Sequence, residues 1–555
     1  MNNFFLNDRR LIRSTWQSFE RDVARLMTLI GFSDVRIIGG TGDKGADILG
    51  VNAHGLWVVQ CKYTTNSLAS KAALDEVLNA GAAYEANRLC IALSRPASDN
   101  FKRYRDEISS NGPKIQIWGP EQLLKLSYNA FDFPPSLKEL RSYQIDAMSS
   151  FRNALVDAGK AQMVLATGLG KTTIMASVVQ DLFATGRLTN NRVLVLAHMR
   201  DLVSQLHTSF WTQISSNIPT QQLSEGEEPV SWEGITFATF QSARQRLNKM
   251  PKFDLVLVDE AHHVGAESFL MVLDELQPNM LGGATATPWR NDGFVIDEVL
   301  GNPVVRVGIE EGLAKGFLSE VDYRVFADNI DWEYVQQISK NNYSLRELNK
   351  KLIIPTRDER AADLIVSVFS EERRNQGIVF SPSIEHARHL SLTLRQASMS
   401  CELITSEMSK QERALTLARF KKGEFKLALT IDIFNEGVDV PDVDLIIFMR
   451  ATHSRRIFIQ QLGRGLRISP NKDKVVVLDF VSDLRRMIEV VELDAAVKAL
   501  EVEKIGLGRR LVEFSDRATG SFLQEWILDQ ADLLNNDSSM LSLPKLNFPV
   551  NRGVQ

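Results

Sequence analysis

The segment at residues 163–173, MVLATGLGKTT, carries residue types that can hold the phosphates of a nucleotide. Its glycines let backbone N–H groups approach phosphate oxygens, and a helix that starts there adds positive potential. Lys171 is expected to reach the β- and γ-phosphates, and the hydroxyl group of Thr172 to ligate Mg²⁺. From this segment alone, the alternative is an ordinary strand, turn and helix that bind no nucleotide. The reason is that Leu165 occupies the position where the strict phosphate-loop pattern has glycine. The nucleotide-binding candidates are Thr167, Gly168, Gly170, Lys171, Thr172 and Thr173.

A second segment with suitable chemistry is LVLVDEAHH, residues 255–263. Its apolar residues predict a buried strand, and two acids follow at the carboxyl end, where open parallel sheets bind their ligands. Asp259 is expected to hold Mg²⁺ through water, and Glu260 to polarise the water that attacks the γ-phosphate. Taken together with the lysine-bearing loop, this acidic pair indicates a nucleoside triphosphatase. The alternative is that the two segments are unrelated strand ends.

A third group of polar side chains lies near the amino terminus, on two runs that predict a hairpin. The runs are GGTGDKGADILGV (39–51) and LWVVQCKY (56–63). Gln60 and Lys62 are two residues apart on a strand, so they point to the same side, and Asp47 begins the neighbouring strand. A carboxylate, an amide oxygen and a backbone carbonyl suit a hard ion such as Mg²⁺, and the lysine can activate water. Glu20, on the preceding amphipathic helix, is a further candidate for this patch.

The elements that must position these groups are predicted by alternating apolar runs and helical stretches. From about 137 to 300 and again from about 355 to 482, this alternation indicates parallel strands covered by helices on both faces. The expected strands are Met163–Ala166, Val193–Ala197, Ile235–Ala238, Leu255–Val258, Gly377–Phe380, Cys401–Ile404, Leu427–Ile431, Leu445–Met449 and Val475–Phe480.

The motifs over residues 137–482 resemble those of superfamily 2 helicases and translocases of the DEAH type. The resemblance implies two RecA-like domains that share one ATP site and move along a nucleic acid. Arg141 and Gln144 resemble the adenine-recognition element, and Glu436, Gly437 and Asp439 are implied at the ATP cleft. The other matching segments are HMRDLVSQ (198–205), TFATFQS (236–242), Ala284–Pro288 and TIDIFNEGVDVPDVD (430–444).

The segment QQLGRGLR, residues 460–467, matches the helicase pattern QxxGRxxR completely. Arg464 and Arg467 are three residues apart, so on a helix they share one face and could neutralise transition-state charge as arginine fingers do. The expected strand-binding element of the second motor domain lacks its His-Gly, although Arg413 and Phe420 occupy suitable positions. No strand-separating hairpin is evident, so translocation without unwinding stays open.

Residues 15–126 resemble the Mrr-type restriction endonuclease domain, a branch of the PD-(D/E)xK nucleases in which glutamine replaces the second acid. The pattern GxGDxGxD followed by QxK carries this resemblance, which implies a Mg²⁺-dependent DNA endonuclease. Asp47 and Gln60 would then hold the metal, and Lys62 and Glu20 would complete the catalytic group. A nuclease-like fold that binds DNA without cutting it, or an ordinary α/β domain, stays open.

The predicted fold is α/β: a restriction-endonuclease-like domain, two RecA-like doubly wound parallel-sheet domains and a short helical C-terminal extension. Pro134 and Pro135 interrupt the pattern and indicate a linker. The expected boundaries are 1–126 for the nuclease-like domain, 127–136 for the linker, 137–310 for the ATP-binding domain, 311–354 for a connector, 355–484 for the second RecA-like domain and 485–555 for the extension.

The amino-acid composition excludes several classes of protein. With 44 % hydrophobic and 24 % charged residues and a net charge of −5, the 555-residue chain is neither disordered nor a basic nucleic-acid coat. Scattered cysteines, an unsuitable amino terminus for a signal peptide and no long apolar run predict a cytoplasmic protein without a membrane partner.

The leading hypothesis is an ATP-driven DNA translocase fused to a DNA endonuclease, with ATP and Mg²⁺ as cofactors. Its expected partners are duplex or branched DNA and the further subunits of a restriction or phage-defence system. The alternatives are a repair or remodelling helicase whose first domain only binds DNA, and an RNA helicase.

Overall fold

The computed structural model folds into two compact units. The first comprises Met1–Leu165, Gly170–Arg306 and Ser409–Ala414, and the second comprises Ala166–Leu169, Val307–Met408 and Leu415–Gln555. The structure describes residues 5–38, 45–64, 69–224, 226–263, 267–286, 296–326, 329–330, 342–343, 353–354, 358–431, 443–449, 463, 465–468, 472, 474–480, 497, 500, 505–506, 512–513 and 541–542.

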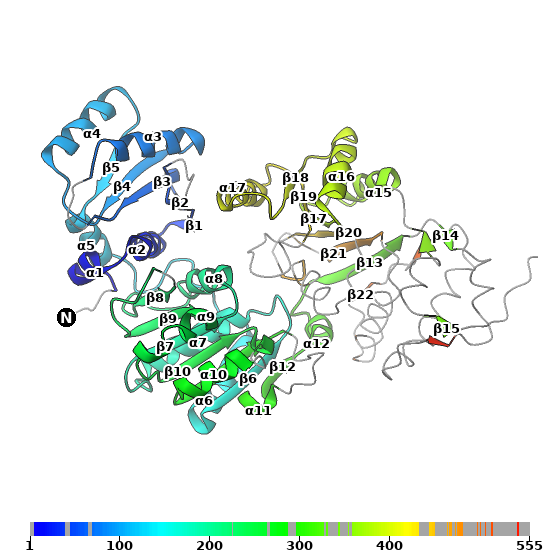
Figure 1. Ribbon diagram of the computed structural model, residues 1–555. Coiled ribbons are helices and arrows are strands. Elements are labelled where there is room, and N and C mark those ends of the chain that lie inside the picture. The colour runs from blue at the N-terminus through cyan, green and yellow to red at the C-terminus, as the bar shows by residue number, and fades with distance from the viewer. Residues whose placement is uncertain are drawn as a thin grey trace, which may run out of the picture. The chain divides into compact units, whose positions relative to one another are not determined.

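The first unit begins with a five-stranded sheet in the order β1-β2-β3-β4-β5. Strands β1 to β3 are antiparallel neighbours, whereas β3, β4 and β5 run parallel. Helices pack on this sheet from both sides (Figure 1). The elements are β1 (Ser33–Ile37), β2 (Ile48–Asn52), β3 (Gly55–Lys62), β4 (Arg88–Leu93), β5 (Ile115–Trp118), α1 (Asp8–Arg13), α2 (Trp16–Leu29), α3 (Ala72–Ala83), α4 (Asp99–Asn111) and α5 (Pro120–Tyr128).

The predicted hairpin is confirmed, because Asn52 pairs with Gly55 across the turn between β2 and β3. The amphipathic helix expected to carry Glu20 is also present, as α2. The hydroxyl oxygen of Thr15 accepts a hydrogen bond from the backbone N–H of Ser18 at 3.2 Å, and this cap fixes the helix start.

The same unit continues with a seven-stranded sheet in the order β12-β6-β11-β10-β7-β9-β8. The neighbours from β6 to β8 are all parallel, as the continuous apolar runs predict. The elements are β6 (Lys160–Leu165), β7 (Arg192–Ala197), β8 (Thr220–Leu223), β9 (Gly234–Thr239), β10 (Leu255–Asp259), β11 (Met280–Thr285), β12 (Pro303–Val307), α6 (Ser142–Ala158), α7 (Lys171–Ala184), α8 (Arg200–Phe210), α9 (Phe240–Arg244), α10 (Glu267–Leu276), α11 (Asp297–Leu300) and the 3₁₀ turns Leu247–Lys249 and Ala261–His263.

Charged side chains of α1 and α2 dock the first sheet domain onto the segment around β8. Arg25 is 1 % exposed and donates to the backbone oxygens of Ile218 at 2.8 Å and Ser215 at 3.0 Å. Burial lowers the pKa of Arg25 to about 9, which leaves its guanidinium charged at neutral pH. A buried charge must keep its partners, so this contact holds the two sheet domains of the first unit together.

Further polar contacts of α1 and α2 extend this docking surface. The Nε of Arg10 lies 2.6 Å from Asp22, and its Nη2 donates to the backbone oxygen of Thr220 at 2.5 Å. Arg21, on the same helix as Arg25, pairs with Glu227. The two sheet domains are therefore joined by buried polar contacts as well as by the chain between them.

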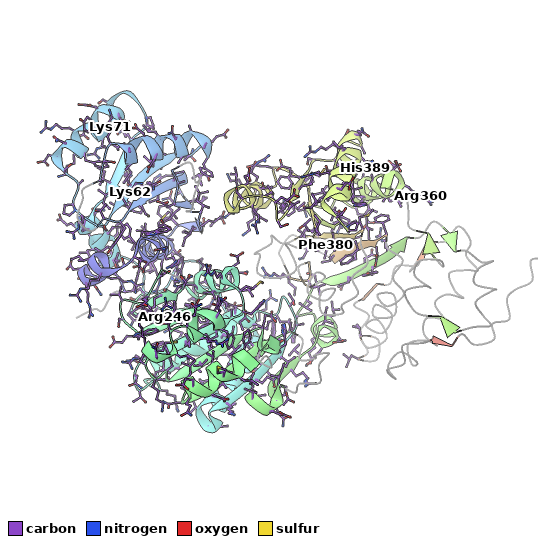
Figure 2. The ribbon with its side chains drawn as sticks, in the orientation of Figure 1. Lys62, Lys71, Arg246, Arg360, Phe380 and His389 are labelled. Atoms are coloured by element: carbon purple, nitrogen blue, oxygen red, sulfur yellow. The ribbon has the colours of Figure 1, made fainter. Side chains whose placement is uncertain are left out.

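The second unit contains an eight-stranded sheet in the order β18-β19-β17-β20-β21-β13-β22, with β23 also paired to β13. Every pair among these strands is parallel. Phe380, labelled in Figure 2, ends β17, and its ring stacks on Phe448 with centroids 5.5 Å apart. The elements are α12 (Ile309–Ala314), β13 (Glu320–Phe326), β14 (Asn329–Ile330), β15 (Asn342–Tyr343), β16 (Ile353–Ile354), α15 (Asp358–Glu371), β17 (Gly377–Phe380), α16 (Ile384–Gln396), β18 (Cys401–Ile404), α17 (Lys410–Lys421), β19 (Leu427–Thr430), β20 (Leu445–Phe448), β21 (Lys474–Asp479), β22 (Ile505–Gly506), β23 (Val512–Glu513) and β24 (Leu541–Ser542).

The predicted α/β class is confirmed, and each predicted strand is present to within a few residues at its ends. The stretch expected as a connector, 311–354, supplies β13, which pairs along its length with β21. Of the expected helical extension, 485–555, most lies outside the described residues, but Ile505–Gly506 and Val512–Glu513 are strands that pair with β13 and not helix. Cys61, Cys90 and Cys401 are buried and form no disulfide. Within the part of the chain that the structure describes, no helix is both long and apolar enough to span a membrane.

Candidate functional site

Three candidate motifs end up at one edge of the seven-stranded sheet. Strands β6, β11 and β10 are parallel neighbours, with Asp259 in register with Ala284 and Thr285 in register with Val164. The glycine loop follows β6, the acidic pair ends β10, and the Ala-Thr segment ends β11. Because carboxyl ends of parallel strands share one edge, residues far apart in the sequence meet where such sheets bind ligands.

The glycine loop adopts a backbone that requires its glycines. Gly168 has φ +93° and Gly170 has φ +87°, both in the left-handed region that other residues rarely enter. The Nζ of Lys171 donates to the backbone oxygen of Leu165 at 3.2 Å, so the amine folds back over the loop. Helix α7 starts at Lys171, which directs its free N–H groups and positive end toward the loop.

Gln144, predicted to read adenine, connects the start of α6 to this loop. Its Oε1 accepts a hydrogen bond from the backbone N–H of Arg141 at 2.9 Å, which caps the helix. Its Nε2 lies against Gly170, where a Cβ atom would overlap it. The side chain therefore also supports the glycine loop.

Asp259 is a buried acid at the end of β10, with 8 % exposure. Burial and then the charge of Glu260 raise its pKa to about 7, while Lys171 and His198 oppose that rise. Its Oδ1 has no hydrogen-bond partner. A buried carboxylate oxygen that has no hydrogen-bond partner favours a bound cation.

Glu260 has φ +48°, a strained backbone for a glutamate, and such strain occurs often at functional sites. Its Oε2 lies 3.3 Å from the Nδ1 of His262, and that nitrogen lies 3.0 Å from the Oγ1 of Thr285. His262 and Thr285 are both buried. One imidazole therefore links the acid after β10 to the Ala-Thr segment after β11.

The residues around Asp259 fit a hard divalent cation. The site provides the carboxylate of Asp259, and the predicted Thr172 hydroxyl lies in the first turn of α7. Among the described residues, no group of three His, Cys, Asp or Glu side chains could hold a metal. Mg²⁺ suits this sparse set, because it retains waters and binds one or two carboxylates together with substrate phosphates.

In the second unit, only part of the QxxGRxxR segment is described. Arg467 is exposed, and its backbone oxygen accepts a hydrogen bond from the Ser319 hydroxyl at 3.0 Å. Within this unit, a Cβ atom placed on Gly168 would lie 3.6 Å from the Cγ of Arg467. Gly168 and Arg467 are therefore neighbours within the second unit. Lying outside the described residues are Arg464, Glu436, Gly437 and Asp439.

The expectation that Phe420 helps to bind a nucleic-acid strand is wrong. Phe420 is 0 % exposed and packs its ring against Phe425, with centroids 5.1 Å apart. It belongs to the apolar face of α17, whereas Arg413 on the same helix is partly exposed. The hydrophobic gain from burying a large aromatic ring explains this placement.

The second candidate site lies on the hairpin of the first sheet domain. Asp47 is 4 % exposed, and its Oδ2 accepts hydrogen bonds from the Nε2 of Gln60 at 2.7 Å and the backbone N–H of Cys61 at 2.6 Å. Gln60 is equally buried, and its Oε1 has no hydrogen-bond partner. An orphaned amide oxygen beside a fixed carboxylate fits a hard cation such as Mg²⁺.

Glu20 and Lys62 border this pair. Burial, followed by the charges of Asp47 and of Glu20 on α2, raises the pKa of the Cys61 thiol well above its ordinary value. Lys62, labelled in Figure 2, ends β3 and forms an ion pair with Glu76 of α3. Of the residues predicted for this site, Asp47 and Gln60 are joined by a hydrogen bond, Lys62 is paired with Glu76, and Glu20 is a buried residue of α2.

Two residues near the sites were not predicted. Glu76 lies on α3 and reaches Lys62 only because that helix packs on β3. His262 was assigned to the acidic motif without a contact of its own, yet it approaches Thr285. Neither contact has a signal in sequence spacing, since each joins separate elements.

Comparison with known families identifies domains in three segments of the chain. Residues 11–127 match the family model "Restriction endonuclease", 137–290 match "Type III restriction enzyme, res subunit", and 359–469 match "Helicase conserved C-terminal domain". A restriction-endonuclease domain of the Mrr type thus precedes the two domains of a superfamily 2 helicase.

Individual relatives agree with the helicase part. IRC3 of Saccharomyces cerevisiae, named as an ATP-dependent helicase, is 27 % identical over 355 residues, which cover 62 % of this chain and 51 % of IRC3. The "DNA 3'-5' translocase XPB2" of Sulfurisphaera tokodaii is 27 % identical over 425 residues, covering 69 % of this chain and 91 % of XPB2. The chain spans about half the length of the first of these relatives.

One solved structure matches most of the chain, "ATP-dependent Type ISP restriction-modification enzyme LlaBIII bound to DNA". The match has a TM-score of 0.53 and 16 % identity, and it covers 94 % of this chain and 42 % of that one. At this level of sequence identity, the match shows a similarity of fold alone.

Proposed function

We propose that this protein is an ATP-driven DNA translocase or helicase fused to a Mg²⁺-dependent DNA endonuclease. The observation that carries the proposal is the presence of two separate acid sites, each with an orphaned buried oxygen, at Asp259 and at Gln60. The first lies beside a phosphate loop and the second beside a lysine. These are the settings that phosphoryl transfer and phosphodiester hydrolysis require.

In the motor, the N–H groups of the glycine loop and the amine of Lys171 would bind the β- and γ-phosphates. Thr172 and Asp259 would hold Mg²⁺, which neutralises developing charge on the phosphates. Glu260 would orient the attacking water, with His262 fixing its carboxylate. The remaining assigned residues are Arg141 and Gln144 at the adenine, Thr167, Gly168, Gly170 and Thr173 in the loop, Glu436, Gly437 and Asp439 at the cleft, and Arg464 and Arg467 as arginine fingers.

In the nuclease, Asp47 and the amide oxygen of Gln60 would hold Mg²⁺, which polarises the scissile phosphate. Lys62 would position or activate the attacking water, and Glu20 would complete the polar wall of the site. The hydrogen bonds from Gln60 and the Cys61 amide to Asp47 already fix the carboxylate, so little reorganisation is needed on metal binding.

The biological setting that we propose is restriction or phage defence in the cytoplasm, with further subunits as partners. The pairing of restriction-type nuclease and motor families supports it. We also propose the domain limits 1–126, 137–310 and 355–484, with a linker at 127–136. Since β13 pairs with β21, the connector 311–354 contributes a strand to the second motor sheet.

One specific observation favours a second candidate, a repair or remodelling helicase whose first domain only binds DNA. The ammonium group of Lys62 is engaged by Glu76, which would restrain a catalytic lysine. An assay of the full chain separates the two candidates. Plasmid, replicative phage and branched DNA are incubated with and without ATP and Mg²⁺, and cleavage and ATP hydrolysis are scored together. Cleavage that Asp47→Ala removes supports the nuclease, whereas no cleavage of any substrate supports the binding module.

A further inference from the structure

The outer face of α1 and the first residue of α2 expose a cluster of apolar and basic side chains. Ile12 is 57 % exposed and Trp16 is 51 % exposed, and both arginines beside them, Arg9 and Arg13, are exposed as well. Residues 9, 12 and 13 share one helix face, while the opposite face buries Arg10 and Leu11. We call Arg9, Ile12, Arg13 and Trp16 the α1 face.

The α1 face adjoins the nuclease site. The hydroxyl group of Tyr63 donates to the backbone oxygen of Ile12 at 2.8 Å, and Tyr63 directly follows Lys62. Its ring lies 6.0 Å from that of Phe19 on α2. Trp16 and Glu20 are four residues apart on α2, so the indole lies one turn from the acid on the same side of the helix.

Three exposed arginines lie near this corner. Arg9 and Arg13 carry two exposed guanidinium groups, with Asp8 as the only acid among residues 7–16. At the end of β4, next to β3, the exposed Arg95 donates from its Nε to the backbone oxygen of Thr64 at 3.1 Å. A half-exposed tryptophan among arginines is complementary to a strand of nucleic acid, in which phosphates meet the cations and a base meets the ring.

We propose that the α1 face holds an unpaired DNA base by stacking it on Trp16, next to the phosphodiester that the nuclease cuts. This inference rests on the proposed nuclease function and specifies its substrate class: DNA with a single-stranded segment, such as a flap, gap or overhang. A base within a duplex has both ring faces covered by its neighbours, whereas an unpaired base can stack on an indole. The exposed arginines position the strand by its phosphates.

The binding test uses the full-length protein in EDTA, so that no DNA is cut. A flap substrate with 5-iodouracil in its single-stranded arm is irradiated, and cross-linked peptides are mapped by mass spectrometry. We expect the cross-link at the peptide that contains Trp16. Trp16→Ala should abolish it, and Trp16→Tyr should retain it because a phenol ring also stacks.

Cleavage in Mg²⁺ provides the second readout. Trp16→Ala should lower kcat/KM on the flap about 5-fold to 100-fold and leave blunt duplex within about 2-fold, since a single stacked base contributes that range. The matched control is Phe131→Ala, because Phe131 is also an exposed aromatic residue of the first unit, at 58 %. That variant should cleave both substrates like the unaltered protein.

The outcomes separate this inference from the proposed function. If the unaltered protein cuts flaps and Trp16→Ala cuts them equally well, the inference is overturned and the nuclease stands. If nothing is cut but Trp16 still cross-links, the nuclease proposal fails and the base-binding surface stands. If Trp16→Ala instead dissociates an oligomer in sedimentation and no cross-link forms, the α1 face binds a second copy and the inference is overturned.

Discussion

The proposed nuclease and motor sites each contain a buried acid at which we propose a bound cation, but the two acids are held in different ways. In the nuclease domain the carboxylate of Asp47 is held by two hydrogen bonds, and the orphaned atom is the neutral amide oxygen of Gln60. In the motor the orphaned atom belongs to the carboxylate of Asp259 itself, whose pKa is raised to about 7.

The difference indicates how much each site depends on its ligand. An acid fixed by hydrogen bonds is organised before the metal binds, which suits a site that must wait for DNA. A buried acid that keeps one oxygen without a hydrogen-bond partner is unfavourable until a cation binds, so we expect the proposed motor site to depend more on its nucleotide and metal. The following experiments test this contrast.

The largest effect is expected at the motor. Glu260→Gln keeps the size of the side chain but removes the charge that orients water, so ATP turnover should fall on the order of 10³-fold. Steady-state ATPase assays with saturating DNA measure the change. Glu275→Gln, in α10, is the matched control and should keep normal turnover. Normal turnover in Glu260→Gln would remove this residue from the mechanism.

The next largest effect is expected at the nuclease. Asp47→Ala removes the carboxylate that Gln60 and Cys61 support, so DNA cleavage should fall at least about 10²-fold. DNA-stimulated ATP hydrolysis should stay within about 2-fold, because the motor acids lie on another sheet. Cleavage by Asp47→Ala, shown free of contaminating nuclease, would contradict the assignment.

A pH effect is expected where the two sheet domains of the first unit dock. Burial, followed by the charges of Arg21, Arg25 and Arg10, holds the pKa of His207 well below 6.5. The unfolded chain therefore takes up a proton below pH 6.5 that the folded chain refuses, and stability is lost as the pH falls. The loss should be about 1.4 kcal/mol per pH unit.

His207→Gln tests this origin, since glutamine keeps a polar side chain without a titrating group. Urea unfolding of both proteins between pH 7.5 and pH 5.5 cancels the contributions of all other groups. The unaltered protein should lose more stability over that interval, and equal losses would show that His207 titrates normally.

The smallest effect is expected from the ion pair between Lys62 and Glu76. Glu76 is 42 % exposed, so Glu76→Gln should change stability little, as exposed pairs contribute only modestly. Releasing the lysine should alter the cleavage rate a few-fold and shift its pH profile. A 10²-fold loss of cleavage would instead make Glu76 a member of the catalytic group.

Local patterns were sufficient for much of this protein. Continuous apolar runs located the parallel strands, and a period of two placed Gln60 and Lys62 on one side of β3. Glycine, lysine and acid spacing located the motor loops, because each motif's chemistry is contained in a few consecutive residues. Those same patterns carried the resemblance to the helicase and nuclease families.

Other features depended on contacts between distant elements. Arg25 looks like a surface residue of an amphipathic helix, yet it is buried where α2 meets the segment before β8. The sequence pattern places Phe420 at a strand-binding position, but its ring is buried by the packing of α17. Glu76 reaches Lys62 only across the helix–sheet interface. Sequence spacing determines which side chains share one face of a helix or strand. Whether those side chains are buried, and with which partners they pair, depends on the surface that packs against that face, and only the tertiary structure defines that surface.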